Sequence, residues 1–112
     1  MIEVQSNVSE IIKDFEQLTT KARYLLSSQI LADANKHARM DTGELIRSSQ
    51  RASNLVRGEL VWDTDYAKKV YYTGRPSHDT NPDAQLMWVD FARDRYIQDW
   101  MVIFARVYEK YN

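Results

Sequence analysis

The stretch that decides the fold of this chain runs from residue 62 to residue 74 and reads Trp62-Asp63-Thr64-Asp65-Tyr66-Ala67-Lys68-Lys69-Val70-Tyr71-Tyr72-Thr73-Gly74. It begins as the end of a strand and continues as a short helix over residues 65–73. Asp63 and Asp65 are predicted caps, because carboxylates accept hydrogen bonds from the free N–H groups at a helix start and suit its positive dipole end. Gly74 supplies the left-handed residue that commonly closes a helix. A helix this short is unstable alone, so we expect it to pack against other elements or another chain.

The size and charge of the chain set the first limits. Its 112 residues correspond to a single domain over residues 1–112. It has 15 basic and 16 acidic side chains, whereas nucleic-acid readers usually carry a basic excess. Without cysteine it forms neither disulfides nor thiolate metal sites. There is no basic region followed by an apolar run at the N-terminus, and no uncharged stretch near the ~18 residues of a membrane span. We therefore predict a soluble cytoplasmic protein with no membrane association.

Residues 7–39 have the pattern of one long amphipathic helix. Its apolar stripe has alternating spacings of four and three and includes Ile11, Phe15, Leu18, Ala22 and Leu25. Asn7 followed by Glu10 fits a capping box. His37 falls in the basic last turn, where positive charge complements the dipole, and we interpret it as a solvent-facing residue. The stripe is wide, which favours packing against a sheet or a second helix over a two-stranded coiled coil.

A β-hairpin is predicted over residues 45–63. Gly43 breaks the helical pattern before it and is expected to adopt a positive φ or to allow a close approach. Residues 45–56 lack helix caps, Arg57-Gly58 fits a turn, and Leu60 and Trp62 then share one face of a strand. A stable sheet needs three strands or more. A further strand must therefore come from Glu3-Val4, from the 45–56 run itself, or from a partner chain.

The C-terminal third is predicted to be a loop over residues 74–81 and a helix over residues 82–111. Asn81 is the expected cap and Pro82 the first helical residue. The apolar stripe of the helix comprises Trp88, Ala92, Tyr96, Trp100, Phe104, Val107 and Tyr111. A polar centre at 93–95 leaves open whether this is one helix or two. The predicted fold class is α+β, with long N-terminal and C-terminal helices packed on a small antiparallel β-sheet and a short connecting helix.

Catalytic and metal-binding patterns are missing from the sequence. His78 lies between Ser77 and Asp79, but adjacent residues cannot converge as the members of a catalytic triad do. The two histidines do not have the spacing of zinc ligands. With glycines only at 43, 58 and 74, a phosphate-binding loop cannot be built. We predict no enzymatic activity, no metal and no cofactor.

Aromatic residues are the remaining feature of the sequence that suggests a function. Three tryptophans and seven tyrosines exceed what a small core obviously needs, and together with arginine these residues dominate protein interfaces. We assign Trp62, Trp88 and Trp100 to the core. The predicted protein-interface residues are Tyr66, Tyr71, Tyr72, Arg75, His78, Asp79, Tyr108 and Tyr111.

The order of several segments carries a family resemblance over roughly Ala22 to Trp100. After the long helix come Asp41-Thr42-Gly43-Glu44-Leu45-Ile46-Arg47-Ser48-Ser49, then Val61-Trp62-Asp63-Thr64-Asp65-Tyr66-Ala67, Tyr71-Tyr72-Thr73-Gly74, Asn81-Pro82 and a tryptophan-bearing helix. In this order the chain resembles the minor capsid proteins of tailed bacteriophages, in particular the head–tail joining or tail-completion proteins of the neck. The resemblance implies a structural role without catalytic residues.

What the resemblance implies about partners is a homo-oligomeric ring that contacts portal, adaptor and tail proteins. The genome would pass through this ring without specific binding. The protein would reside in the neck of the virion, and in the host cytoplasm before assembly.

A closed ring needs two different patches on each subunit. The hairpin edge at residues 45–63 is one candidate, through strand addition. The short helix and the loop after it form the other, with residues 75–81 ordering upon assembly. Two other classes stay open: a small cytosolic regulator that binds a peptide or protein through its aromatic surface, and a hydrolase or nuclease that uses Asp63, Asp65 and His78.

Overall fold

The computed structural model of the protein describes residues 3–40 and 42–112, so that Asp41 of the resembling segment lies outside the described residues. In order, the elements are β1 (Val4–Asn7), α1 (Val8–Ile11), the 3-10 helix η1 (Phe15–Gln17), α2 (Thr20–Asn35), α3 (Glu44–Ala52), β2 (Glu59–Trp62), α4 (Ala67–Tyr72) and α5 (Trp88–Tyr111). β1 and β2 pair antiparallel, with Val4 opposite Trp62 and Asn7 opposite Glu59. This combination of helices and an antiparallel sheet confirms the predicted α+β class.

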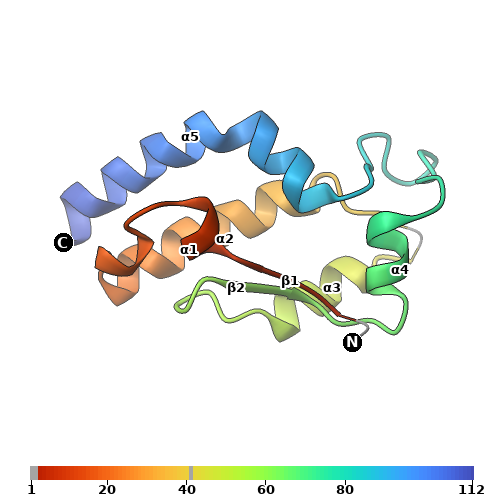
Figure 1. Ribbon diagram of the computed structural model, residues 1–112, viewed down its shortest axis with the longest axis horizontal. Helices are drawn as coiled ribbons and strands as arrows, with labels where there is room; N and C mark the ends of the chain where they lie inside the picture. Colours follow the sequence, from red (N-terminus) through yellow and green to blue (C-terminus); the bar gives the residue numbers. More distant parts are fainter. Residues whose placement is uncertain (1–2, 41) are drawn as a thin grey trace.

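The two long helices, α2 and α5, lie side by side along the longest of the three dimensions, which are 41 × 25 × 19 Å (Figure 1). α3 lies along β2, on the side away from β1. α4 and the loop that follows it are at one end of the molecule, and the C-terminus is at the other. α5 is a single helix of 24 residues, which settles whether the C-terminal helix is continuous.

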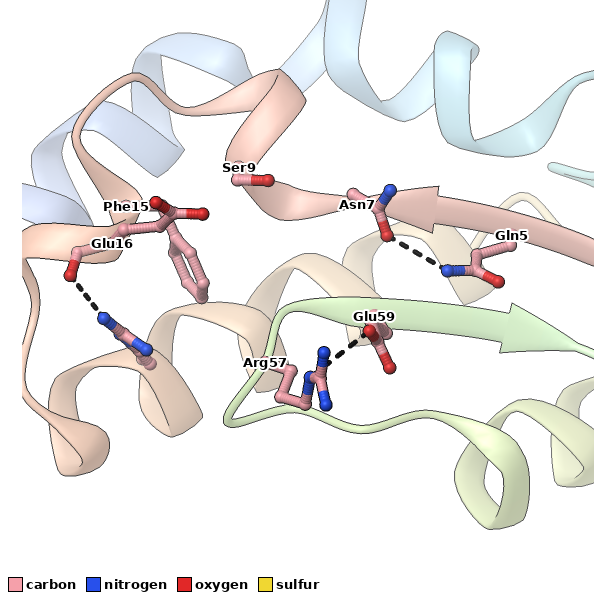
Figure 2. A pocket seen from close by; sticks show the side chains of 8 residues that line it. Gln5, Asn7, Ser9, Phe15, Glu16, Arg57 and Glu59 are labelled. Atoms are coloured by element: carbon pink, nitrogen blue, oxygen red, sulfur yellow. Dashed lines mark hydrogen bonds and ion pairs between the residues drawn. The ribbon is translucent and has the colours of Figure 1, made fainter.

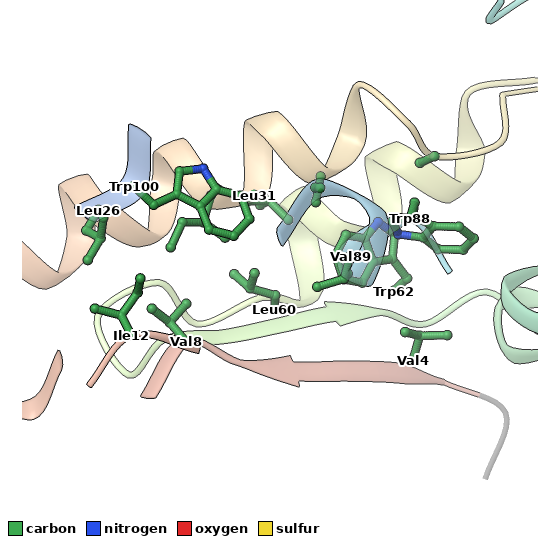
Figure 3. Packing of buried hydrophobic residues seen from close by; sticks show 14 of the residues in the cluster. Val4, Val8, Ile12, Leu26, Leu31, Leu60, Trp62, Trp88, Val89 and Trp100 are labelled. Atoms are coloured by element: carbon green, nitrogen blue, oxygen red, sulfur yellow. The ribbon is translucent and has the colours of Figure 1, made fainter. Parts of the chain in front are cut away.

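The core lies between the helix pair and the sheet. Figure 3 shows side chains from both sides meeting there: Val4, Val8, Ile12 and Leu60 from the sheet and its flank, and Leu26, Leu31, Val89 and Trp100 from the long helices. Trp62, Trp88 and Trp100 are fully buried, as predicted. The indole N–H of Trp62 donates to Asn35 (2.9 Å), and that of Trp100 donates to Asp33 (2.8 Å). Both acceptors belong to α2, so these bonds join α2 to β2 and to α5.

The prediction of one helix over residues 7–39 is wrong. The long helix begins only at Thr20, where the Thr19 hydroxyl accepts a hydrogen bond from the Ala22 amide. Asp14 has a φ of +67°, which a right-handed helix does not accommodate. Asn7 precedes α1 but does not cap it, since its side-chain amide donates to Glu10 instead (3.2 Å). Phe15, Leu18 and Ala22 of the predicted stripe are nonetheless buried, whereas Ile11 and Leu25 are half-buried. The residues before α2 reach the core from α1, η1 and the extended residues that follow each of them.

The first half of the predicted hairpin over residues 45–63 is also wrong, because residues 44–52 form α3. The hydroxyls of Ser48 and Ser49 are buried and donate to backbone carbonyls three residues earlier (2.6 Å each). These bonds satisfy both hydroxyls within the helix. β2 pairs instead with β1, so residues from Val4 onward supply a strand, as one of the three alternatives expected, in a sheet of two strands among the described residues. The turn at Arg57-Gly58 is confirmed, and so is the positive φ of Gly43 (+81°).

Asn81 and Pro82 do not start the C-terminal helix, which begins at Trp88. The Asn81 side chain accepts from the Asp83 amide, as in a turn, and donates to two carbonyls at the end of α2. The segment between Pro82 and α5 is held by further long-range bonds. The Gln85 amide donates to the His37 carbonyl (2.8 Å), and the Met87 amide donates to the Tyr71 carbonyl (2.8 Å). In a helix these two amides would instead donate along the helix axis to carbonyls of the preceding turn.

The central helix is shorter than predicted, since α4 covers residues 67–72 of the expected 65–73. Gly74 has a φ of +83° just after its end, as predicted. The predicted caps are wrong, because no side chain caps α4. Asp63 instead forms an ion pair with Arg51 of α3 (2.6 Å), which joins the end of β2 to that helix. Asp65 is exposed in the turn before α4.

Candidate protein interface

Two exposed tyrosines flank α4 at one end of the molecule. Tyr66 immediately precedes the helix and is 40% exposed, and Tyr72 ends it and is 55% exposed. Arg75, His78 and Asp79 are exposed in the loop that follows. The structure therefore brings five of the eight predicted interface residues to this end. We call Tyr66, Tyr72 and the loop residues 75–79 the α4 surface.

The loop of the α4 surface is anchored at both ends. At its start the Arg39 guanidinium donates to the carbonyls of Val70, Thr73 and Arg75 (3.2, 2.8 and 3.2 Å). At its end the Asn81 side-chain amide donates to the carbonyls of Lys36 and Ala38 (3.0 and 2.9 Å). Both anchors lie at the C-terminal end of α2 or just beyond it. The exposed residues between them are thus presented from a fixed base.

Tyr71 was predicted as an interface residue but belongs to the core, with an exposed fraction of 4%. Its ring packs edge-on against Trp88 (centroids 4.5 Å apart), and its hydroxyl donates to Asp90 at the start of α5 (3.1 Å). Burial raises the pKa of this hydroxyl well above its usual value near 10, and the negative charge of Asp90 raises it further. Tyr71 thus positions α4 against α5.

This raised pKa predicts a loss of stability in alkali. Below about pH 10 Tyr71 is protonated in both the folded and the unfolded chain; above it the unfolded chain loses the proton first, so the free energy of unfolding falls as pH rises. Tyr71→Phe should lower stability by about 1 kcal/mol at neutral pH through the lost hydrogen bond, and the decline in alkali should become shallower. Urea midpoints measured between about pH 8 and pH 11.5 test this. Equal slopes for the two proteins would contradict it.

The remaining two predicted interface residues lie near the opposite end, on the C-terminal half of α5. Tyr108 is 47% exposed, and Tyr111 is half-buried. Two further apolar residues of this helix are exposed, Met101 (42%) and Val102 (51%), and the sequence analysis did not single them out. The sequence could have indicated this surface, because Met101 and Tyr108 are seven residues apart and therefore lie on one helix face, beside the buried stripe. We call Met101, Val102 and Tyr108 the α5 surface.

A hollow of about 580 Å³ lies over the polar face of the sheet near the turn at Arg57-Gly58 (Figure 2). Most of its polar groups are already bonded, and the carboxylate of Glu16 is exposed. Arg57 pairs with Glu59 (3.4 Å), Arg23 donates to the Glu16 carbonyl, and the Gln5 amide donates to Asn7 (3.2 Å). This leaves no buried unpaired acid or base in the hollow to do chemistry.

Of the three residues considered for hydrolysis, Asp63 and His78 have local structural partners, and Asp65 is exposed. Asp63 pairs with Arg51, and the His78 ring contacts the Ala84 carbonyl (3.2 Å). Within the described residues no three His, Asp or Glu side chains gather as metal ligands. His37 is buried, contrary to the prediction, and lies between the Asp83 carbonyl (2.9 Å) and the Tyr96 hydroxyl (3.0 Å). It joins the loop before α5 to the helix itself.

Comparison with known proteins identifies a family. The family model described as minor capsid protein matches residues 2–108, almost the whole chain. Searches of curated proteins and of solved structures gave no match. In the part of the chain that the structure describes, no helix is long and apolar enough to cross a membrane.

Proposed function

The chain belongs to the minor capsid protein family of bacteriophages, and from this premise we propose that it acts at the head–tail junction, as one subunit of a ring in the neck. Membership in this family implies a structural role in the virion. The finer assignment to the neck, to ring formation and to portal, adaptor and tail proteins as partners is our proposal. It rests on the resemblance of segment order and on the distribution of exposed apolar residues.

The observation that carries the ring is that two separate exposed surfaces lie toward opposite ends of the long axis (Figure 1). The α4 surface presents Tyr66 and Tyr72, and the α5 surface presents Met101, Val102 and Tyr108. A ring requires a head-to-tail contact in which one patch of each subunit meets a different patch of the next. Aromatic and methionine side chains are enriched at such contacts. The two surfaces fit the two sides of one contact.

The charge of the chain agrees with passage of DNA through such a ring. The formal charge is −1, and tight binding to phosphates needs several unopposed lysines or arginines. We therefore propose that the genome passes without specific binding. We also propose that the protein is not an enzyme and works without a cofactor, since two of the three residues considered for catalysis, Asp63 and His78, have structural partners and the third, Asp65, is exposed.

A phage that carries the double change Tyr66→Ser and Tyr72→Ser should assemble heads and tails that fail to join. Interface anchors of this type contribute about 1–2 kcal/mol each or more, so each subunit contact should weaken by roughly 10²-fold. The expected result is a large fall in plaque titre, with separate filled heads and tails in electron micrographs of the lysate.

Tyr24→Ser is the matched control, because Tyr24 is similarly exposed (49%) but lies on α2, outside both surfaces. It should leave the titre unchanged, and circular dichroism should show that all variants fold. Gold-labelled antibody against the wild-type protein locates it in the particle. Labelling spread over the capsid shell, or normal joining of heads and tails in the double variant, would refute the neck assignment.

A further inference from the structure

The two edges of the small sheet are not equivalent. Register and hydrogen bonds show which backbone groups of each strand face outward. In an antiparallel pair of strands, every second pair of opposite residues is hydrogen-bonded. The Val8 amide donates to the Gly58 carbonyl, so Ser6 with Leu60 and Val4 with Trp62 are also hydrogen-bonded pairs. Gln5 and Asn7, and opposite them Val61 and Glu59, therefore direct their backbone N–H and C=O groups away from the partner strand.

The outward groups of β2 are satisfied within the chain. Glu59 exchanges both of its backbone hydrogen bonds with Asn54 (2.8 and 2.9 Å), and the Val61 amide donates to the Ser53 hydroxyl (2.9 Å). The Asp63 amide just beyond the strand donates to Ser48 (3.3 Å). The edge at residues 45–63, which the sequence analysis had offered for strand addition, is thus closed by α3 and the segment after it.

The outward groups of β1 have no such cover. Among the described residues, no acceptor meets the backbone N–H of Gln5 or Asn7 and no donor meets the C=O of Gln5, whereas the C=O of Asn7 accepts the first hydrogen bond of α1. Edge strands are commonly protected against pairing by being very short, or by a lysine, a proline or a bulge. β1 is short, with the four residues Val-Gln-Ser-Asn, but it is regular and has no lysine, proline or bulge. A sheet with only two strands is also below the number usually needed for stability.

A groove of about 380 Å³ runs beside this open edge. It is lined by residues 3–6 and by Lys68, Tyr71, Tyr72 and Asp90. Its charged lining comprises two carboxylates, of Glu3 and Asp90, and one ammonium group, of Lys68. None of these three takes part in the ion pairs found among the described residues. The exposed ring of Tyr72 offers an aromatic wall. A basic side chain suits such a groove, because its stem packs on the ring and its cation is attracted to the acids.

We infer that the outer edge of β1 receives an extended segment of another virion protein as a third strand, with an arginine or lysine of that segment in the groove between Tyr72 and Asp90. Strand addition supplies affinity through the main chain, and pockets for alternate side chains supply specificity. The inference rests on the proposed function only in taking the donor to be a virion protein. It adds a third contact, at the edge of β1, which borders the α4 surface and shares Tyr72 with it.

A second copy of this chain is a poorer occupant. Both edges of β2 are used, so within the described residues a copy could offer only its own β1. Two four-residue strands would then pair over roughly 13 Å. Such two-fold pairing would also leave the groove beside Lys68 and Asp90 without a basic side chain.

The test uses purified protein and a fluorescein-labelled peptide with the sequence Thr-Val-Thr-Arg-Thr-Val-Thr as probe. Fluorescence anisotropy should show saturable binding of this peptide, and binding at least roughly tenfold weaker when its arginine is replaced by glutamate. N-methylation of the alternate peptide amides that face β1 should weaken binding by a similar factor. Methylation of the other alternate set should not. Hydrogen exchange at the Gln5 and Asn7 amides should slow in the complex.

On the protein side, Gln5→Pro removes an outward N–H that makes no bond within the described residues, and it should weaken binding of the arginine peptide roughly tenfold. Gln5→Thr keeps this N–H and is the matched control. Asp90→Asn should reduce the preference for arginine over glutamate, and its carbonyl can still accept from Tyr71. If Gln5→Pro fails to fold, the methylated peptides on wild-type protein decide alone.

Three outcomes would overturn the inference. They are no binding of the arginine peptide, equal binding of both methylated sets, and a wild-type dimer that Gln5→Pro converts to a monomer. The third would show that a second copy occupies the edge. Because the readout is peptide binding by isolated protein, failure here leaves the test of the neck assignment in phage particles unaffected.

Discussion

Replacing Trp100 by alanine is expected to remove most of the stability of the protein. Its side chain is fully buried between α5 and α2, and truncating a buried aromatic residue costs about 3–5 kcal/mol. The change also removes the indole N–H that donates to Asp33, which is itself buried. A buried acceptor left without this partner costs about 1–3 kcal/mol more. Since small domains have about 5–15 kcal/mol in all, urea denaturation followed by circular dichroism should show a variant near its unfolding midpoint in buffer.

Trp100→Phe separates the two contributions. Phenylalanine keeps most of the apolar contact but has no N–H, so its cost should be about 1–3 kcal/mol. Asp33 retains Lys36 (2.9 Å) and Gln29 (3.1 Å) on its other oxygen, which limits the penalty. If Trp100→Phe proved as costly as Trp100→Ala, the hydrogen bond would contribute more to stability than the packing of the ring. If both cost less than about 1 kcal/mol, Trp100 would not be buried between α5 and α2.

The elements that sequence analysis predicted well are those whose pattern and core contacts agree over a long stretch. In α5 the buried residues Trp88, Ala92, Trp100 and Val107 follow helical spacing over five turns, so periodicity alone identifies the helix and its inner face. In β2 the alternation of Leu60 and Trp62 with half-buried Glu59 and Val61 does the same for a strand. These patterns are direct consequences of burying one face of a regular element.

The N-terminal segment shows why a periodic pattern can mislead. Ile12, Phe15 and Leu18 are buried at helical spacing, yet they reach the core from an extended residue, a 3-10 turn and a loop. A regular spacing of apolar residues shows only that their side chains point to the same side. A series of short segments of different kinds can produce the same spacing as one helix. The one local signal was Thr19-Thr20, since threonine at position 19 caps α2.

Hydrogen bonds that the sequence pattern does not reveal accompany the other errors. In α3 they are local, since the hydroxyls of Ser48 and Ser49 donate to carbonyls three residues earlier and are thereby accommodated in a helix. Asn81 and Pro82 form a reasonable helix start by local rules, but bonds from Gln85 and Met87 to distant carbonyls hold the chain out of a helix. No local sequence pattern encodes such partners.

For the candidate interface, residue type was a partial guide. Tyr66, Tyr72 and Tyr108 are exposed as expected, whereas Tyr71 is buried because Asp90 lies within reach of its hydroxyl. That contact joins residues 19 positions apart and depends on how α4 meets α5. The open edge of β1 was not predicted, because a four-residue strand is too short to show alternation clearly. Whether this edge is open also depends on which segment pairs with β2.

Gly58→Ala is expected to be the most damaging of the small substitutions. Gly58 has a φ of +70°, a conformation that costs an L-residue about 1–2 kcal/mol. A Cβ there would lie 2.8 and 2.9 Å from two ring carbons of Phe15 and 3.1 Å from the Cβ of Val8. Both neighbours are buried and have little room to move, so overpacking should add about 1–3 kcal/mol. The total, roughly 2–5 kcal/mol, would appear as a lower urea midpoint with an unchanged slope.

Gly74→Ala provides the control that separates backbone strain from steric clash. Its φ of +83° carries the same cost, but the nearest atom belongs to the Arg39 guanidinium, 3.3 Å away, and a shift of a few tenths of an ångström accommodates a Cβ there. The expected loss is therefore only about 1–2 kcal/mol. The difference between the two variants measures how firmly Phe15 packs on the turn before β2. Equal losses would mean that the ring moves aside, and that the turn is not held firmly against η1.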